Sequence, residues 1–231
     1  MQYDSLSIVG PRVDNQDSLQ IQKSEDITFA CIADGVGGNA GGSVASQLSV
    51  KKLMEAFESN IGLSLELFAN IDSCLKQAAL QDDTLHGMAS TLSACAVTNG
   101  RLIIGHCGDS RIMLLRKNGI KQLTPDHSEV EKLIREGILS RKEAVTYPRK
   151  NVLESALGAS KELLFFGGEV NLEVGDRILL TTDGVHGVFS KRELRDLSLQ
   201  ASTPAEFISL IVNAGLEARA TDNASLIVID I

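Results

Sequence analysis

Short apolar runs recur along the chain, and their length and alternation predict that it is built mainly from β-strands. These runs lie near residues 5–9, 18–21, 27–33, 92–98, 101–107, 111–116, 119–123, 165–172, 177–182 and 224–229. The pairs Asn99-Gly100 and Asn118-Gly119 predict two-residue hairpin turns, because both residue types tolerate positive φ. The closely spaced central runs therefore predict an antiparallel meander.

Two pairs of helices interrupt the strands. In the first pair apolar residues recur at helical spacing, at Val50, Leu53, Met54 and Phe57 and then at Leu67, Ile71, Leu75 and Ala78. The second pair is predicted at 191–199 and 204–214, where Thr203, Pro204 and Glu206 form a helix start signal. Paired helices disfavour a doubly wound parallel sheet. We therefore expect an α+β fold, a β-sandwich of two mainly antiparallel sheets flanked by pairs of helices, in four αββα layers.

Residues 124–160 break this pattern. They begin with Thr124-Pro125-Asp126-His127 and continue into a polar helix, Gly137 and a second short helix. Their charge density indicates a surface excursion over one edge of the sheets, and such a segment can act as a lid. We call this segment the flap. Because no repeat, low-complexity stretch or linker is visible, we expect one domain over residues 1–231.

Composition narrows the classes of protein. The 231 residues are 43% hydrophobic, enough to bury a large core, and the net charge of −8 argues against nucleic-acid binding. That charge fits either a solvated acidic surface or carboxylates gathered around cations. Four cysteines without CxxC spacing predict reduced core residues, and no signal peptide or run of ~20 apolar residues is visible. We expect a cytoplasmic protein that does not bind membranes.

Three aspartates stand next to apolar runs. Asp34 and Asp183 follow such runs and precede glycine, and Asp222 comes just before the last run. Carboxylates at one end of a sheet raise one another's pKa, so a cluster of them needs a counter-charge. The simplest is a hard cation such as Mg²⁺ or Mn²⁺, which prefers oxygen ligands. Alone, each Asp-Gly pair is more typical of a turn.

The other candidates are ambiguous one by one. Asp109 lies between two strand runs and reads as a hairpin turn, while Arg12 could clamp a phosphate or be a surface arginine. The glycine-rich stretch after Asp34 could cradle a phosphate, but it matches neither a P-loop nor a dinucleotide motif. The histidines show no zinc spacing and no GxSxG elbow is present, which disfavours a serine or cysteine nucleophile. We expect His106 to be structural and His186 to lie near a site.

Seven short motifs follow one another along the chain. They are Arg12-Val13-Asp14-Asn15-Gln16-Asp17, Ala33-Asp34-Gly35-Val36-Gly37-Gly38, Cys107-Gly108-Asp109-Ser110-Arg111, Leu123-Thr124-Pro125-Asp126-His127-Ser128, Asn151-Val152-Leu153, Thr182-Asp183-Gly184-Val185 and Asp222-Asn223-Ala224-Ser225. In this order they resemble the signature of the metal-dependent Ser/Thr protein phosphatases of type 2C (PPM), in their compact bacterial form. Each motif is weak alone, but seven in the correct order are specific, and they cover essentially the whole chain.

The resemblance implies a metal centre at one end of a β-sandwich. Asp34, Asp183 and Asp222 would hold two Mg²⁺ or Mn²⁺ ions, and the Gly35 carbonyl would be a further ligand. Two such ions can share a water, lower its pKa and direct it at phosphorus. The implied reaction is direct in-line hydrolysis of phosphoserine and phosphothreonine in proteins, without a phosphoenzyme.

The same resemblance assigns supporting roles. Asp17 would hold metal-bound waters, Asp109 with Asp183 would bind a weaker third ion, and Arg12 would bind the phosphate. The implied partners are phosphorylated proteins and a cognate Ser/Thr kinase, and we expect a monomer.

Four positions depart from the family pattern. Gln16 stands where many members have glutamate, Val36 and Asn39 stand where animal and bacterial members have histidine, and Gly187 stands where some have aspartate. The proton donor to the leaving group is therefore open, with a water on the third ion as the substitute. One alternative is a phosphoprotein-binding module of the same fold without useful turnover. Another is a phosphatase with the same chemistry that acts on an anti-sigma-factor antagonist.

Overall fold

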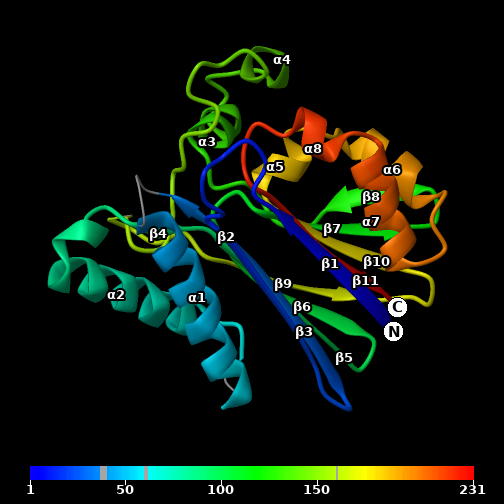
Figure 1. Ribbon diagram of the computed structural model, residues 1–231, viewed down its shortest axis with the longest axis horizontal. Helices are drawn as coiled ribbons and strands as arrows, with labels where there is room; N and C mark the ends of the chain where they lie inside the picture. Colours follow the sequence, from blue (N-terminus) through cyan, green and yellow to red (C-terminus); the bar gives the residue numbers. More distant parts are fainter. Residues whose placement is uncertain (37–40, 60–61, 160) are drawn as a thin grey trace.

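Two antiparallel sheets lie face to face, and helices cover the outer side of each (Figure 1). The computed structural model describes residues 1–36, 41–59, 62–159 and 161–231. This arrangement confirms the α+β sandwich in four layers that the sequence predicts. Gly37 and Gly38 of the predicted glycine-rich motif, and Asn39 after it, lie outside the described residues.

The first sheet joins the two ends of the chain to its middle. Its strand order is β1-β11-β10-β7-β8, with bounds Gln2–Ile8, Ala224–Asp230, Arg177–Thr181, Arg111–Arg116 and Gly119–Gln122. The helices α6 (Lys191–Ser198) and α7 (Pro204–Asn213) cover its outer face. The short helices α5 (Asp183–His186) and α8 (Leu216–Arg219) lie at the end of the sheet that is uppermost in Figure 1.

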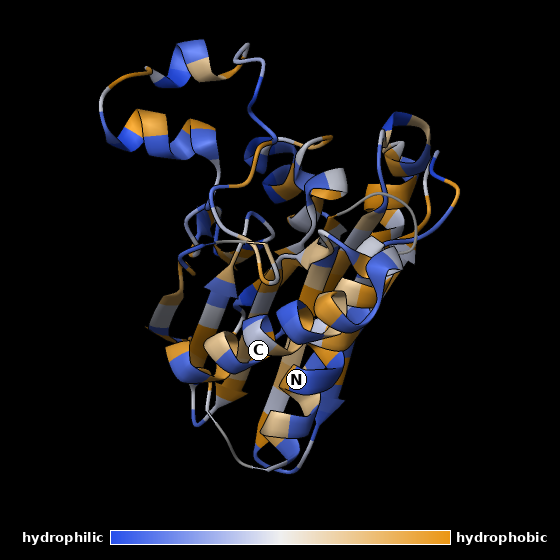
Figure 2. Cartoon of the chain, turned by 90° about the vertical axis from the view of Figure 1, so that its left-hand side faces the viewer, coloured by the Kyte–Doolittle hydropathy of each residue, from blue (hydrophilic) through white to orange (hydrophobic). Residues whose placement is uncertain are grey.

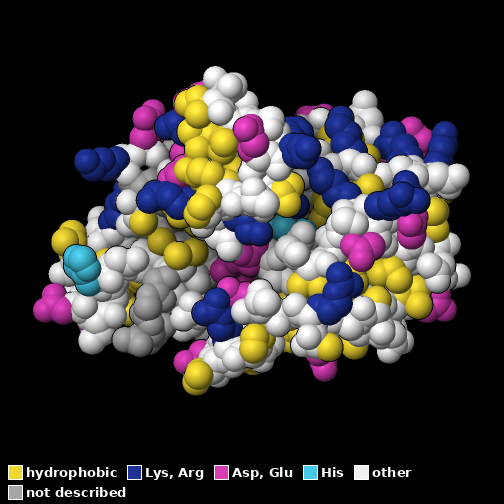
Figure 3. All heavy atoms as spheres, turned by 90° about the horizontal axis from the view of Figure 1, so that it is seen from above, with side chains coloured by type: hydrophobic (Ala, Val, Ile, Leu, Met, Phe, Trp, Pro, Cys, Tyr) yellow, Lys and Arg dark blue, Asp and Glu magenta, His cyan; other side chains and the backbone are white. Residues whose placement is uncertain are grey.

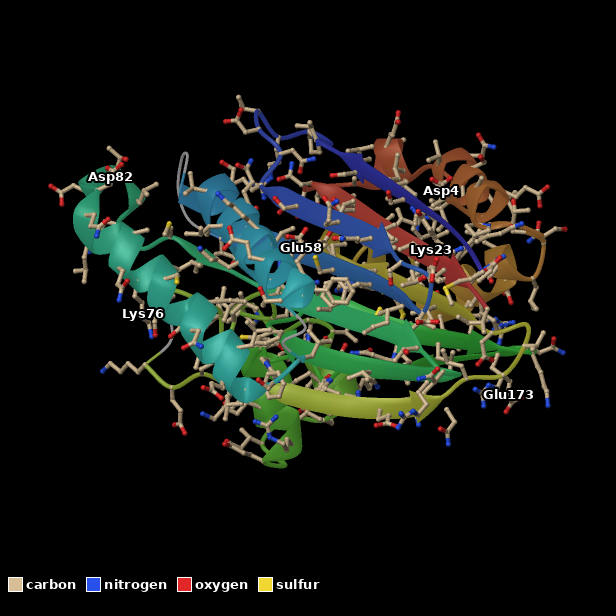
Figure 4. The ribbon with its side chains drawn as sticks, turned by 90° about the horizontal axis from the view of Figure 1, so that it is seen from below. Asp4, Lys23, Glu58, Lys76, Asp82 and Glu173 are labelled. Atoms are coloured by element: carbon tan, nitrogen blue, oxygen red, sulfur yellow. The ribbon has the colours of Figure 1, made fainter. Side chains whose placement is uncertain are left out.

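The second sheet has the strand order β2-β3-β5-β6-β9. The bounds are Asp17–Lys23, Ile27–Val36, Leu92–Thr98, Arg101–Cys107 and Phe166–Asn171, and the short strand β4 (Ala89–Ser90) pairs with the end of β3. Helices α1 (Gly41–Glu58) and α2 (Leu65–Gln81) cover its outer face, and a 3₁₀ turn at Asp83–Leu85 follows α2. In Figure 4, Lys76 and Asp82 lie on the solvent side of this layer.

The flap carries two short helices, α3 (Glu129–Arg135) and α4 (Arg141–Ala144). The Ser128 and Ser140 side chains cap their N-termini by accepting backbone N–H bonds. Both helices project from the body of the molecule above one end of the sheets (Figures 1 and 2). Their mixture of blue and orange in Figure 2 contrasts with the largely orange strands, because the flap buries little of its own surface.

Three apolar clusters form the core, one between the sheets and one under each helix pair. Strand β3 shows why the sequence pattern is continuous rather than alternating. Phe29 and Cys31 pack towards α1 and α2, whereas Ala30 and Ile32 pack between the sheets. A strand that is buried on both faces needs apolar residues at every position.

Two local predictions are wrong. Strand β3 does not stop at Asp34, because Gly35 and Val36 pair with Ser90 and Ala89 of β4.

The hairpin predicted at Asn118-Gly119 has its turn one residue earlier in the chain. Arg116 pairs with Gly119, so the turn residues are Lys117 and Asn118, and the positive φ of 54° falls on Lys117. The Asn99-Gly100 turn is confirmed, with φ of 49° and 71°. Within the described residues no helix is both long and apolar enough to cross a membrane.

Candidate active site

Five aspartates that are far apart in sequence meet at one end of the sandwich. Asp17 begins β2, Asp34 lies in β3, Asp109 follows β6, Asp183 begins α5, and Asp222 precedes β11. Burial, followed by the charges of the other four, raises the pKa of Asp34 well above its ordinary value. Figure 3 looks onto this end, where acidic side chains lie in a central hollow with Lys and Arg side chains around it.

Asp17 and Asp34 occupy paired positions on β2 and β3. Burial, opposed by hydrogen bonds from Ser225 and Thr182 and reinforced by the charges of Asp183 and Asp222, raises the pKa of Asp17 to about 6. The Asp17 Oδ2 atom accepts a hydrogen bond from the Thr182 hydroxyl at 2.9 Å. Its Oδ1 atom is buried and has no hydrogen-bond partner among the described residues. This carboxylate oxygen therefore accepts no hydrogen bond from the described residues, which is unusual for a buried polar atom.

The pKa values of Asp109 and Asp183 are also raised. Burial and the charges of Asp183 and Asp126, opposed by Arg111, together raise the pKa of Asp109 to about 7. The pKa of Asp183 is raised by burial and then by Asp222. Protons or cations must therefore neutralise part of this cluster near neutral pH.

A hard divalent cation fits these residues. Every donor in the cluster is a carboxylate oxygen, which suits Mg²⁺ or Mn²⁺ rather than a softer metal. Among the described residues, no group of three or more His, Cys, Asp or Glu side chains is already arranged to hold a metal ion. Bound Mg²⁺ usually keeps several water ligands and takes only one or two carboxylates from the protein, so loosely spaced aspartates are compatible with it.

The glycines after Asp34 and Asp183 permit close approach of the backbone rather than a turn. A Cβ atom at Gly35 would collide with the backbone of Gly42 at the start of α1, and one at Gly184 would collide with the backbone of Asn223. Each Asp-Gly pair thus lets two chain segments meet beside its carboxylate. The interpretation of these pairs as ordinary turns does not hold here.

Arg12 lies at the rim of the cluster. Its Nη2 atom is 2.6 Å from Oδ2 of Asp222. The loop that carries Arg12 is tied down by Asn223, whose Oδ1 accepts from the Gln16 N–H at 2.9 Å. The Asn223 Nδ2 atom donates to the carbonyls of Val9 at 2.7 Å and Asp14 at 2.9 Å.

The sequence analysis assigned no role to Asn223, Thr182 or Thr91, although the first two stand in the quoted motifs. The Thr91 hydroxyl accepts the Asp34 N–H at 2.8 Å and lies 2.7 Å from the Ser110 hydroxyl, beside Asp109. Thr182 and Asn223 are each adjacent to a candidate aspartate, which is the one signal that pointed to them. Thr91 has no such neighbour, and only the pairing of distant strands brings it to Asp34.

Two hollows meet at the aspartates. The first, about 640 Å³, extends from Arg12 and Asp222 to the flap, and the second, about 550 Å³, extends along the end of β3. Asp109, Asp183 and Asn151 line both.

Two histidines behave as predicted. His186 lines the first hollow, and its Nδ1 lies 2.9 Å from the Thr181 hydroxyl. Burial, then Arg111, lowers the His186 pKa well below its ordinary value, so the ring is neutral. His106 is buried, and its Nε2 donates to the Pro125 carbonyl at 2.7 Å, which confirms a structural position.

Comparisons with known proteins decide the family. Residues 12–212 match the family model described as Protein phosphatase 2C. The chain belongs to the protein phosphatase 2C family. Protein phosphatase PhpP of Streptococcus pneumoniae is 32% identical over 235 residues, which span 98% of this chain and 96% of that protein.

Solved structures of 2C-family phosphatases share the fold. The S. agalactiae serine/threonine phosphatase superposes with a TM-score of 0.88 at 26% identity, over 100% of this chain and 99% of that one. The catalytic domain of PstP, solved in complex with two manganese ions, gives a TM-score of 0.82 at 30% identity, over 99% and 97%. The chain is a protein serine/threonine phosphatase, and the resemblance found from its seven motifs is confirmed.

Proposed function

We propose that this 2C-family phosphatase hydrolyses phosphoserine and phosphothreonine in proteins with the help of Mg²⁺ or Mn²⁺ held by the aspartate cluster. Asp34, Asp183 and Asp222, with the Gly35 carbonyl, would hold two ions. Asp109 would hold a weaker third ion with Asp183. The manganese ions in the PstP catalytic domain support this proposal, since that domain is 30% identical to the chain.

The observation that carries the proposal is the state of Asp17. Its carboxylate is buried opposite Asp34, one of its oxygens lacks a protein partner among the described residues, and its pKa is raised to about 6. A carboxylate in that state needs water or a cation beside it. We propose that Asp17 holds the waters that surround the ions, and that Thr182 fixes its orientation through Oδ2.

When bound, ions of this kind neutralise phosphoryl charge and lower the pKa of a coordinated water, which supports in-line attack without a covalent intermediate. The residues of the chain hold the aspartates and Arg12 in place. Thr91 fixes the backbone at Asp34, and Asn223 fixes the loop of Arg12 against the start of β11.

Arg12 is the proposed phosphate-binding residue. Its guanidinium has five N–H donors in a planar fork, and such a fork matches two oxygens of a phosphoryl group. In the structure one of its nitrogens contacts Asp222, which orients the fork at the edge of the first hollow. We propose that Arg12 leaves this contact for the substrate when Asp222 binds a cation. Such substrates would be the products of a Ser/Thr kinase.

The histidines do not supply an obvious proton donor. His186 is half-buried and neutral, and its Nδ1 lies beside the Thr181 hydroxyl, so it is poorly placed to protonate a leaving group. Positions 36 and 39 carry valine and asparagine. We propose that water in the part of the site lined by Asp109 delivers this proton.

The test is phosphate release from a phosphothreonine peptide by the purified protein, with Mn²⁺ or with EDTA. We expect turnover only with Mn²⁺, and we expect Asp183→Asn to lose at least about 100-fold in kcat while its circular dichroism stays native. Asp26→Asn, in the exposed turn between β2 and β3, is the matched control and should keep full activity. Turnover that survives in Asp183→Asn would sink the mechanism. Mn²⁺ binding without any phosphate release would favour the binding-module alternative.

A further inference from the structure

One part of the second hollow beside the aspartates is apolar. Ala89 and Ala156 form its buried base, with 3% and 4% of their surface exposed. Val36 and Val152 stand at its sides with 44% and 38% exposed. We call the part lined by these four residues the apolar pocket. Exposed valines on both sides of one hollow leave apolar surface that a ligand could cover.

The apolar pocket is continuous with the candidate active site. Asp34, Asp109 and Asp183 line the same hollow of about 550 Å³. Successive Cα atoms lie ~3.8 Å apart, so a peptide whose phosphorylated residue reaches these carboxylates places a neighbouring side chain within reach of the pocket. The occupant of the pocket is therefore a part of the substrate.

The charges nearby leave the apolar pocket suited to an uncharged side chain. Glu154 and Lys161 also line the hollow, outside the four apolar residues, and the Glu154 carboxylate is held by Lys132 at 3.4 Å and by Arg135 at 3.3 Å. The first hollow is more cationic, because Arg12, Arg111, Arg141 and Lys150 line it, whereas Lys161 is the cation among the described residues that line the second. The two sides of the reaction centre thus offer different chemistry to the two flanks of a peptide.

We propose that the apolar pocket binds an aliphatic side chain one or two residues away from the phosphorylated residue, so that the preferred substrates are phosphopeptides with leucine, isoleucine, valine or methionine at that position. This inference rests on the proposed function and names the sequence class of its substrate.

The size of the effect follows from burial of a few methylene groups. Discrimination of one side chain by an apolar pocket is typically about tenfold in kcat/KM. The contact lies away from the reacting bond, so it stabilises bound substrate and transition state alike. The preference should therefore appear mainly in KM.

The experiment compares phosphothreonine peptides that differ at one position only. Each of the two positions before and after the phosphothreonine is set to glycine, leucine or aspartate, and kcat and KM are measured at saturating Mn²⁺. We expect leucine at one of these positions to raise kcat/KM about tenfold over glycine, and aspartate there to give no gain. The all-glycine peptide is the reference, because it lacks an occupant for the pocket.

Variants then locate the preference. Val152→Asn should reduce the leucine-to-glycine ratio to below about threefold, since an amide in the pocket must be desolvated, while the all-glycine peptide keeps its kcat/KM within about twofold. Val152→Ile should keep the full ratio. Val174→Asn, in a 97% exposed position between β9 and β10, is the matched control and should behave as wild type.

Two kinds of failure are distinguishable. If the all-glycine peptide is hydrolysed but leucine gives no gain at any position, or if Val152→Asn retains the full ratio, the pocket assignment is overturned and the proposed function stands. If no peptide is hydrolysed with Mn²⁺, the proposed function fails and the pocket assignment falls with it.

Discussion

Asp17 and Asp34 lie directly opposite each other on the antiparallel strands β2 and β3. Like charges in that relationship destabilise a sheet, and burial makes the repulsion stronger than it is in water. Such a pair is what the proposed cation site would require. A cation between the aspartates would convert the repulsion into ligand attraction, and a metal-free protein must hold protons there instead.

The first prediction follows from this pair. At pH 8 in EDTA, Asp34→Asn should raise the melting temperature by roughly 2–6 °C, because it removes one of two opposed charges. The same variant should lose the further stabilisation that Mn²⁺ gives to the wild type. Differential scanning calorimetry with EDTA or Mn²⁺ measures both, with Asp26→Asn as the control. An Mn²⁺-induced shift of wild-type size in Asp34→Asn would contradict the assignment.

A second prediction concerns pH. The pKa of Asp109 rises from its ordinary value of 3.8 to about 7 on folding, mainly through burial. The folded state therefore binds this proton more tightly, so the associated stability is present below pH 3.8 and is lost as pH rises through about 7. In EDTA, Asp109→Asn should be more stable than wild type by roughly 1–3 kcal/mol at pH 8, and the difference should vanish near pH 4.

Urea unfolding across this pH range measures that difference directly. A gap between Asp109→Asn and wild type that widens towards acid pH would have the wrong sign for a raised pKa. With Mn²⁺ present, the stability difference between Asp109→Asn and wild type at pH 8 should shrink or change sign, because only the wild type keeps the carboxylate that can bind an ion.

The third prediction tests the phosphate contact. Arg12→Lys keeps the positive charge but loses the planar fork, and we expect kcat/KM for a phosphopeptide to fall about 10–100-fold. Arg101→Lys is the matched control, since Arg101 is an exposed arginine paired with Glu169 at 2.9 Å on β6. Steady-state kinetics on both variants decides the point. Equal kcat/KM in Arg12→Lys and wild type would remove Arg12 from the mechanism.

A fourth prediction concerns Asn223, to which the sequence analysis assigned no role. Its side chain satisfies backbone groups of Val9, Asp14 and Gln16, so Asn223→Ala should lower the free energy of unfolding by about 1–3 kcal/mol and release the loop of Arg12. Activity should fall as well. Asn171→Ala, at the exposed end of β9, should change neither quantity. A loss of stability without any loss of activity would show that the loop does not depend on this anchor.

The pattern along the chain predicted the layers and singled out Asp34, Asp183 and Asp222, whereas Asp17 and Asp109 were assigned to the site only through the resemblance to the phosphatase family. Buried strands such as β3 require unbroken apolar runs, and each of the first three aspartates stands where such a run begins or ends. The strand β4 has only two residues, too few to produce a pattern, so the continuation of β3 beyond Asp34 was missed. The turn at Lys117 was displaced by one residue because register depends on cross-strand packing, which local propensity does not encode.

The roles of Thr91 and Asn223 are a different kind of omission. Each acts by a hydrogen bond to backbone that is brought near only by folding, from Asp34 for Thr91 and from Gln16 for Asn223. A threonine in a strand and an asparagine before one are both common without any function. The same holds for the apolar pocket, whose residues come from β3, β4 and the end of the flap.

A crystal grown with Mn²⁺ tests whether the aspartates hold divalent cations. Anomalous scattering measured at the manganese edge should show peaks within about 2.5 Å of carboxylate oxygens of Asp34, Asp183 and Asp222. We expect two strong peaks there and a weaker third beside Asp109. Manganese peaks elsewhere on the molecule, with none at these three aspartates, would contradict this expectation.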